Sequence, residues 1–203
     1  MKVQKYVAEL LGTFTLAFAV AISAMMGSPV PTPLIAAVTL AVFVYTVGSV
    51  SGAHLNPAVT LAMATVKKIS VPDAAMYIVV QLLAGFAAFH LAQWLVATPF
   101  NIEDFPRNAG IWKEGLMEAM GAFILVFGVS SVVWKKAPEQ MAGWVIGTSL
   151  FVGLMIAGGL SLGVLNPAVA LGIGLKYTSY MYFVAPLVGG ILAAWVYKYL
   201  AKK

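Results

Sequence analysis

Apolar residues fill most of this chain, in long runs that short polar segments interrupt. A helix needs about 20 apolar residues to cross about 30 Å of hydrocarbon, and six runs are long enough to do so. Pro-containing breakers separate several of them, such as Gly-Ser-Pro-Val-Pro-Thr after the first run. The pattern predicts six membrane-spanning helices, at about residues 6–26, 33–50, 74–96, 115–134, 141–160 and 177–197.

Two further apolar runs, at residues 56–66 and 166–175, are too short to span a bilayer. A helix of this size is about 16 Å long at 1.5 Å per residue, so it reaches only halfway across the hydrocarbon. Each run follows a full span with almost no linker. We therefore predict two half-helices that enter the membrane and stop inside it.

The half-helices belong to an internal repeat. Ser-Gly-Ala-His-Leu-Asn-Pro-Ala-Val at residues 51–59 returns as Ser-Leu-Gly-Val-Leu-Asn-Pro-Ala-Val at residues 161–169. Each half of the chain then holds three spans and one half-helix, and because three is odd, the second half enters the membrane from the opposite side. The prediction is an all-α integral membrane protein with a single channel domain over residues 1–203. Its two inverted repeats cover about residues 1–98 and 112–203, and an outer loop joins them.

An Asn-Pro pair suits a helix that begins at mid-membrane. Its first N–H groups lack partners there; asparagine is a favoured N-cap, and proline at the first helical position has no N–H to leave unpaired. Two such starts meeting at the midplane imply a pore whose asparagines present amide donors and whose helix N-termini oppose cations. A chance helix start explains one copy, but two at matching positions disfavour it. The motif residues are Asn56, Pro57, Ala58, Asn166, Pro167 and Ala168.

Composition agrees with a membrane protein: 62% of residues are hydrophobic and 9% are charged, against about 25% charged in soluble domains. The chain has no cysteine and two histidines, and no catalytic or phosphate-binding arrangement is visible, so we expect no metal, no cofactor and no enzyme activity. The first run carries Glu9 and no clear cleavage site, which favours a retained span over a signal peptide.

The net charge of +5 follows the ends of the apolar runs, which argues against a nucleic-acid partner. Nine of the twelve basic residues fall on one side of the predicted spans. Basic residues accumulate on the cytoplasmic side, so we expect a multi-pass protein of the cell membrane with both termini in the cytoplasm. The three on the other side are Arg107, Lys113 and Lys176.

With the repeated Leu-Asn-Pro-Ala motif and the opening Glu-Leu-Leu-Gly-Thr-Phe at residues 9–14, nearly the whole chain resembles the aquaporin, or major intrinsic protein, family. The resemblance implies six tilted helices around an hourglass pore, a homotetramer, and passive conduction of water or small neutral solutes. It makes Asn56 and Asn166 the paired pore asparagines. Glu9 and Glu118, which align in the repeat, become buried carboxylates that hold the loops; the other interpretation makes them proton carriers.

The chain departs from the family at the outer constriction. Members usually follow the second Asn-Pro-Ala with arginine, but Val169 stands here. Spacing from the two asparagines gives Ala36, Leu154 and Gly163 as the other selectivity-filter positions, so the resemblance implies an apolar filter. Without the fixed charge, the barrier to cations weakens. An apolar ring either loses its water or, if wide, admits larger solutes, and the sequence leaves both outcomes open.

Three functions remain open at this stage. Water or small neutral solutes are the first choice; a channel for ammonia, gas or small uncharged solutes with poor water conduction is the second, and a closed-pore structural protein is the third. We prefer His54 as a residue that orients its loop over a protonation gate, and His90 as a packed or interfacial residue. Arg107 is either a solvated loop residue or a partial replacement for the missing filter arginine.

Overall fold

A computed structural model describes residues 2–97, 101–102, 109–175 and 180–202. Within these ranges the chain forms helices and no strands. Six helices are long and apolar enough to cross a membrane, which confirms the predicted number of spans. They are α1 (Lys2–Met26), α2 (Thr32–Ser51), α4 (Val71–Val96), α5 (Ile111–Val133), α6 (Ala142–Ala157), which a preceding 3₁₀ turn extends to a span of 19 residues from Glu139, and α8 (Met181–Leu200). The short ones are α3 (Pro57–Thr65), α7 (Pro167–Gly172) and the 3₁₀ turn η2 (Glu139–Met141).

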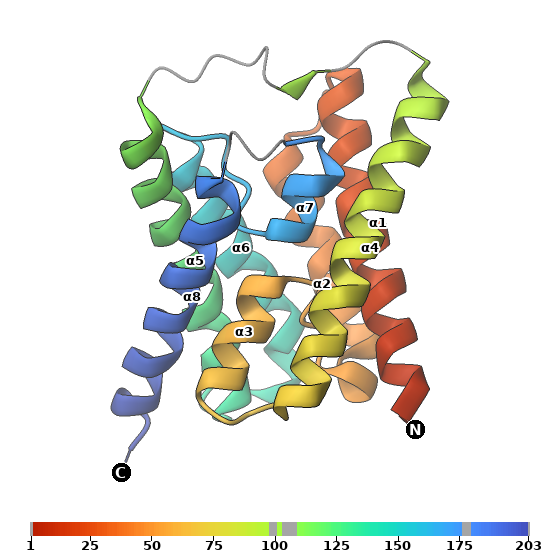
Figure 1. The fold of residues 1–203 in the computed structure, drawn as a ribbon. Coiled ribbons are helices and arrows are strands. Elements are labelled where there is room, and N and C mark those ends of the chain that lie inside the picture. The colour runs from red at the N-terminus through yellow and green to blue at the C-terminus, as the bar shows by residue number, and fades with distance from the viewer. Residues whose placement is uncertain (1, 98–100, 103–108, 176–179, 203) are drawn as a thin grey trace.

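The long helices surround the two short ones, and both chain ends lie at the same face, the lower one in Figure 1. We call this the terminal face and the other the opposite face. Helix α3 lies in the terminal half and α7 in the opposite half. Each packs against the third long helix of the other half of the chain, α3 against α8 and α7 against α4. The two half-helices therefore lie in opposite halves of the molecule, each against the other half of the chain.

Two helix boundaries differ from the apolar runs for local reasons. Helix α1 begins at Lys2, ahead of the apolar run, because lysine and glutamine are good helix formers whatever their polarity. Helix α7 ends at Gly172, short of the predicted residue 175. Gly174 has φ +80° there, and a glycine in this left-handed conformation commonly ends a helix.

Glycines allow the half-helices to approach the long helices closely. A Cβ at Gly85 of α4 would overlap the carbonyl oxygen of Ala168 in α7. On α8, a Cβ at Gly190 would lie 3.2 Å from the carbonyl oxygen of Ala58 in α3. Small residues permit this kind of backbone contact between membrane helices. The first turns of α3 and α7 are thereby held against the helices that enclose them.

Candidate functional site

The two Asn-Pro-Ala motifs cap the half-helices. The side-chain Oδ1 of Asn56 accepts a hydrogen bond from the Ala58 N–H at 2.8 Å, and that of Asn166 accepts one from the Ala168 N–H at 3.0 Å. Both asparagines have extended backbone, and proline occupies the first turn of each helix. Each cap satisfies a donor that a helix start otherwise leaves unpaired.

The asparagines also join the two halves of the chain. The amide Nδ2 of Asn56 donates to the carbonyl oxygen of Leu165 at 2.9 Å, and Nδ2 of Asn166 donates to that of Leu55 at 2.9 Å. Both asparagines are 3% exposed. An amide nitrogen carries two hydrogens, and each of these contacts uses one. The structure therefore brings the two motifs together, with a second amide hydrogen on each nitrogen.

Glu9 of α1 lies against the segment that leads into α3. Its Oε1 accepts from the Ser51 hydroxyl at 2.7 Å and the His54 N–H at 2.9 Å, and its Oε2 accepts from the Leu55 N–H at 2.7 Å and Gln81 Nε2 at 2.9 Å. The carboxylate is fully buried. Leu55 has φ +47°, a conformation that disfavours side chains with a Cβ. Bonds to a charged acceptor are strong, and these offset the strain.

Glu118 of α5 occupies the matching place before α7. It accepts from the Ser161 hydroxyl at 2.8 Å, from the Val164 N–H at 3.0 Å and from the Leu165 N–H at 2.7 Å. It too is fully buried, and Leu165 has φ +56°. The same carboxylate arrangement thus precedes both half-helices.

The terminal half carries polar side chains that the other half lacks. Gln81 Nε2 donates to Thr60 Oγ1 at 2.9 Å, and Thr60 Oγ1 lies 3.1 Å from His54 Nδ1. The repeat places Ala170 and Pro186 where Thr60 and Gln81 stand. His54 lies between α2 and α3, outside the six spanning helices, and burial lowers its pKa below the ordinary value of 6.5. Its imidazole is therefore neutral at neutral pH.

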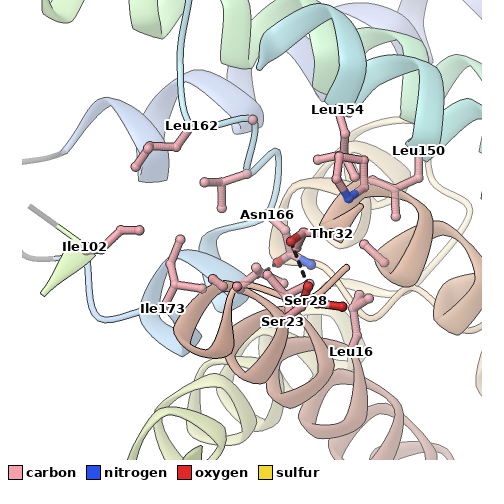
Figure 2. A pocket seen from close by; sticks show the side chains of 18 residues that line it. Leu16, Ser23, Ser28, Thr32, Ile102, Leu150, Leu154, Leu162, Asn166 and Ile173 are labelled. Carbon is pink, nitrogen blue, oxygen red and sulfur yellow. Dashed lines mark hydrogen bonds between the residues drawn. The ribbon is translucent and has the colours of Figure 1, made fainter. Parts of the chain in front are cut away.

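A cavity of about 340 Å³ opens between Asn166 and the opposite face; we call it the opposite cavity. Its wall includes all four predicted filter residues: Ala36, Leu154, Gly163 and Val169. Figure 2 shows Leu150 and Leu154 of α6 on one side of Asn166 and Ile173 on the other. The hydroxyl groups of Ser23, Ser28 and Thr32 also line it, and none of its described lining residues is charged.

A second cavity, of about 470 Å³, lies at the terminal face; we call it the terminal cavity. Its wall contains His54 together with the charged residues Lys68, Asp73 and Glu139. Ile146 lines this cavity and Leu150, one turn along α6, lines the opposite cavity. The two cavities are thus neighbours along α6, and the terminal cavity contains charged side chains whereas the described lining of the opposite cavity contains none.

Not every residue singled out from the sequence belongs to this site. His90 is exposed on α4, its ring against Phe86 with centroids 4.3 Å apart, and it lines neither cavity. Arg107 and Lys176 lie outside the described residues.

Four residues that the sequence pattern does not predict also take part in the polar contacts of the site: Gln81, Thr60, Glu114 and Tyr182. A usable signal existed for Glu114, which lies one helical turn before Glu118 in an otherwise apolar span.

The sequence pattern that describes the major intrinsic protein family matches residues 1–197 of the chain. The chain belongs to the major intrinsic protein family. Among its relatives, aquaporin NIP3-1 of Arabidopsis thaliana is 34% identical over 96% of this chain and 67% of its own length. Aquaporin AqpM of Methanothermobacter thermautotrophicus is 31% identical over 98% of each chain.

An X-ray structure of the aquaglyceroporin from Plasmodium falciparum shares the fold, with a TM-score of 0.68 and 19% identity over 100% of this chain and 96% of that one. As a major intrinsic protein, the chain is a passive transmembrane channel for water or small solutes, and not an enzyme. These relatives do not favour the poorly water-conducting or the closed-pore alternative.

Proposed function

We propose that solutes pass from the opposite cavity to the terminal cavity along the paired asparagines, and that Asn56 and Asn166 each offer one amide hydrogen on the way. The observation that supports this most is the reciprocal bonding of each asparagine to the carbonyl before the other. It fixes both side chains at the meeting point of two helix N-termini, whose positive partial charge disfavours cations.

The opposite cavity supports an apolar selectivity filter made of Ala36, Leu154, Gly163 and Val169. Ala36 and Gly163 are small, which favours a wide filter, and Leu154 and Val169 make its remaining wall apolar. We infer that the channel admits small uncharged solutes larger than water, in addition to water.

Glu9, Glu118 and His54 are proposed to support the loops and not to carry protons. Each carboxylate accepts at least three hydrogen bonds from the loop that it faces, and protonation removes acceptor capacity. His54 similarly gives its backbone N–H to Glu9 and its ring to Thr60.

The assembly and its orientation are part of the same proposal. Nine of twelve basic residues on the terminal side favour cytoplasmic termini and a place in the cell membrane. Large apolar side chains are exposed on the long helices, among them Leu83, Leu116 and Leu192, which suits lipid and a homotetramer. The inverted repeats at about residues 1–98 and 112–203 stay a prediction.

Stopped-flow light scattering of reconstituted vesicles tests the conduction. Vesicles that contain the protein are challenged separately with sucrose, glycerol, urea and ammonium gradients. Under a sucrose gradient, vesicles that contain the protein should shrink faster than bare lipid vesicles, because water leaves through the channel. Under glycerol or urea gradients, the vesicles should first shrink and then swell again as the solute enters. Rates equal to those of bare lipid in every gradient contradict the proposal.

Replacing Val169 with arginine tests the filter. The longer, charged side chain enters the opposite cavity, narrows it and adds hydrogen-bond donors. We therefore expect the ratio of glycerol permeability to water permeability to fall about tenfold. Vesicle swelling rates in glycerol measure it, with Val169→Ile as the uncharged control. An unchanged glycerol-to-water ratio in Val169→Arg contradicts the assignment of Val169 to the filter.

A further inference from the structure

Tyr182, in the first turn of α8, connects Leu162, in the loop before α7, to the carboxylate of Glu114. Its hydroxyl oxygen lies 3.0 Å from Glu114 Oε2 in α5 and accepts the Leu162 N–H at 3.2 Å. Tyr182 is 1% exposed and Glu114 is 5% exposed. Neither residue lines the opposite cavity, so any effect on the pore passes through Leu162.

The direction of these bonds follows from the groups involved. A backbone N–H only donates, so the Tyr182 oxygen must accept from Leu162, and its single hydrogen is then free to go to Glu114. A carboxylate acceptor polarises the hydroxyl and makes its oxygen a better acceptor for the next bond in the chain. Glu114 therefore strengthens the bond that holds Leu162.

The matching tyrosine in the first half behaves in the opposite way. Tyr77 of α4 occupies the repeat position of Tyr182, and its hydroxyl donates to the carbonyl oxygen of Ser51 at 2.8 Å. The position that matches Glu114 there is Lys5, which pairs instead with Asp73 at 2.7 Å. Thus the tyrosine accepts from the loop only in the half that has the carboxylate, and it does so one residue further along the loop.

The loop residue that Tyr182 holds, Leu162, adjoins the proposed filter residue Gly163. Leu162 and Gly163 both line the opposite cavity, and the Gly163 N–H is bonded to Ser161 Oγ at 3.0 Å. Four consecutive N–H groups of the loop thus have acceptors: Tyr182 for Leu162, Ser161 for Gly163, and Glu118 for Val164 and Leu165. Leu162 is the first residue of this series along the chain, and among the described residues only Tyr182 accepts from its N–H.

We propose that Glu114 is a specificity-determining positioning residue: through Tyr182 it fixes the backbone of Leu162 and Gly163 and so sets the width of the opposite cavity at the filter. This inference rests on the proposed function, because it takes the opposite cavity as the filter. Without the hydrogen bond from Leu162 to Tyr182, the loop can move away from α5 and α8. The pore then discriminates less between water and larger solutes.

The test measures glycerol and water permeability of the same vesicles for Glu114→Leu, Glu114→Gln and Tyr182→Phe. Both permeabilities scale with the amount of intact channel, so their ratio does not depend on yield. We expect the glycerol-to-water ratio to rise about threefold or more in Glu114→Leu and Tyr182→Phe, since the net contribution of one hydrogen bond corresponds to a change of a few-fold in an equilibrium. Glu114→Gln retains an acceptor oxygen without the negative charge, so its ratio should lie between those of the wild type and Glu114→Leu.

Tyr199→Phe is the matched control, since Tyr199 is on the same helix, is 74% exposed and loses the same hydroxyl. Tyr182→Phe keeps the ring and the carboxylate, so it carries the test if Glu114→Leu is not recovered. Unchanged ratios in both variants, or a Glu114→Gln ratio that rises as much as in Glu114→Leu, overturn the proposal. Wild-type vesicles that conduct nothing above bare lipid contradict the proposed function instead.

Discussion

Replacing Glu118 with leucine is expected to abolish conduction and to leave little folded protein. The substitution removes the acceptor for the Ser161 hydroxyl and for the N–H groups of Val164 and Leu165, all in a buried segment. An unsatisfied buried donor costs about 1–3 kcal/mol, so the combined loss is on the order of several kcal/mol. Leu165 also loses the contacts that hold its φ of +56°. Thermal unfolding in detergent and vesicle water flux measure the two effects.

A glutamine at the same position separates loop support from proton transfer. Glu118→Gln keeps one acceptor oxygen but has no proton to release at neutral pH, so we expect partial stability and measurable flux. Full stability and wild-type flux in Glu118→Leu contradict the structural role. The matched variant Glu9→Leu should lose at least as much, since Glu9 also accepts from Gln81.

Gly85→Ala is expected to have the second large effect. The added methyl group would overlap the carbonyl oxygen of Ala168, a backbone atom that cannot rotate away. Helices α4 and α7 must then separate, which displaces Asn166 and weakens its 2.9 Å bond to Leu55. Overpacking of this kind costs about 1–3 kcal/mol or more. We expect a lower unfolding temperature and loss of most of the water flux.

Gly48→Ala is the control for stability. A Cβ at Gly48 of α2 meets only Val44 Cγ1, at 3.9 Å, and alanine is a better helix former than glycine. Its unfolding temperature should equal or exceed that of the wild type. If Gly85→Ala unfolds at the same temperature as Gly48→Ala, the close contact between α4 and α7 is wrong.

The sequence predicts the architecture well because bilayer thickness imposes a length on each element. Only runs of about 20 apolar residues span the membrane, so the six long helices and the two short ones separate by length alone. The sequence predicts the ends of the helices less well. Polar residues continue α1 beyond the hydrocarbon, and the end of α7 depends on the backbone conformation at Gly174.

The candidate site, like the fold, is only partly predictable from the sequence. Glu9 and Glu118 can be found in the sequence because they occupy matching positions of the repeat. In the structure each accepts hydrogen bonds from the loop before a half-helix. Tyr182 and Glu114 lie 68 residues apart, and Gln81 and Thr60 are 21 apart. Although Glu114 lies one turn before Glu118, neither the repeat nor a helical period predicts which residues pair, so only the packing of separate helices reveals these two contacts.

The two cavities differ in charge, but this difference cannot make passive transport faster in one direction than in the other. At equilibrium the permeability to a dilute solute is the same in both directions, so charged groups at one mouth do not rectify transport. Their consequence is sided inhibition. An ionic blocker that arrives from the terminal face meets the charged residues Lys68, Asp73 and Glu139, whereas one that arrives from the opposite face meets no charged side chain among the described lining residues.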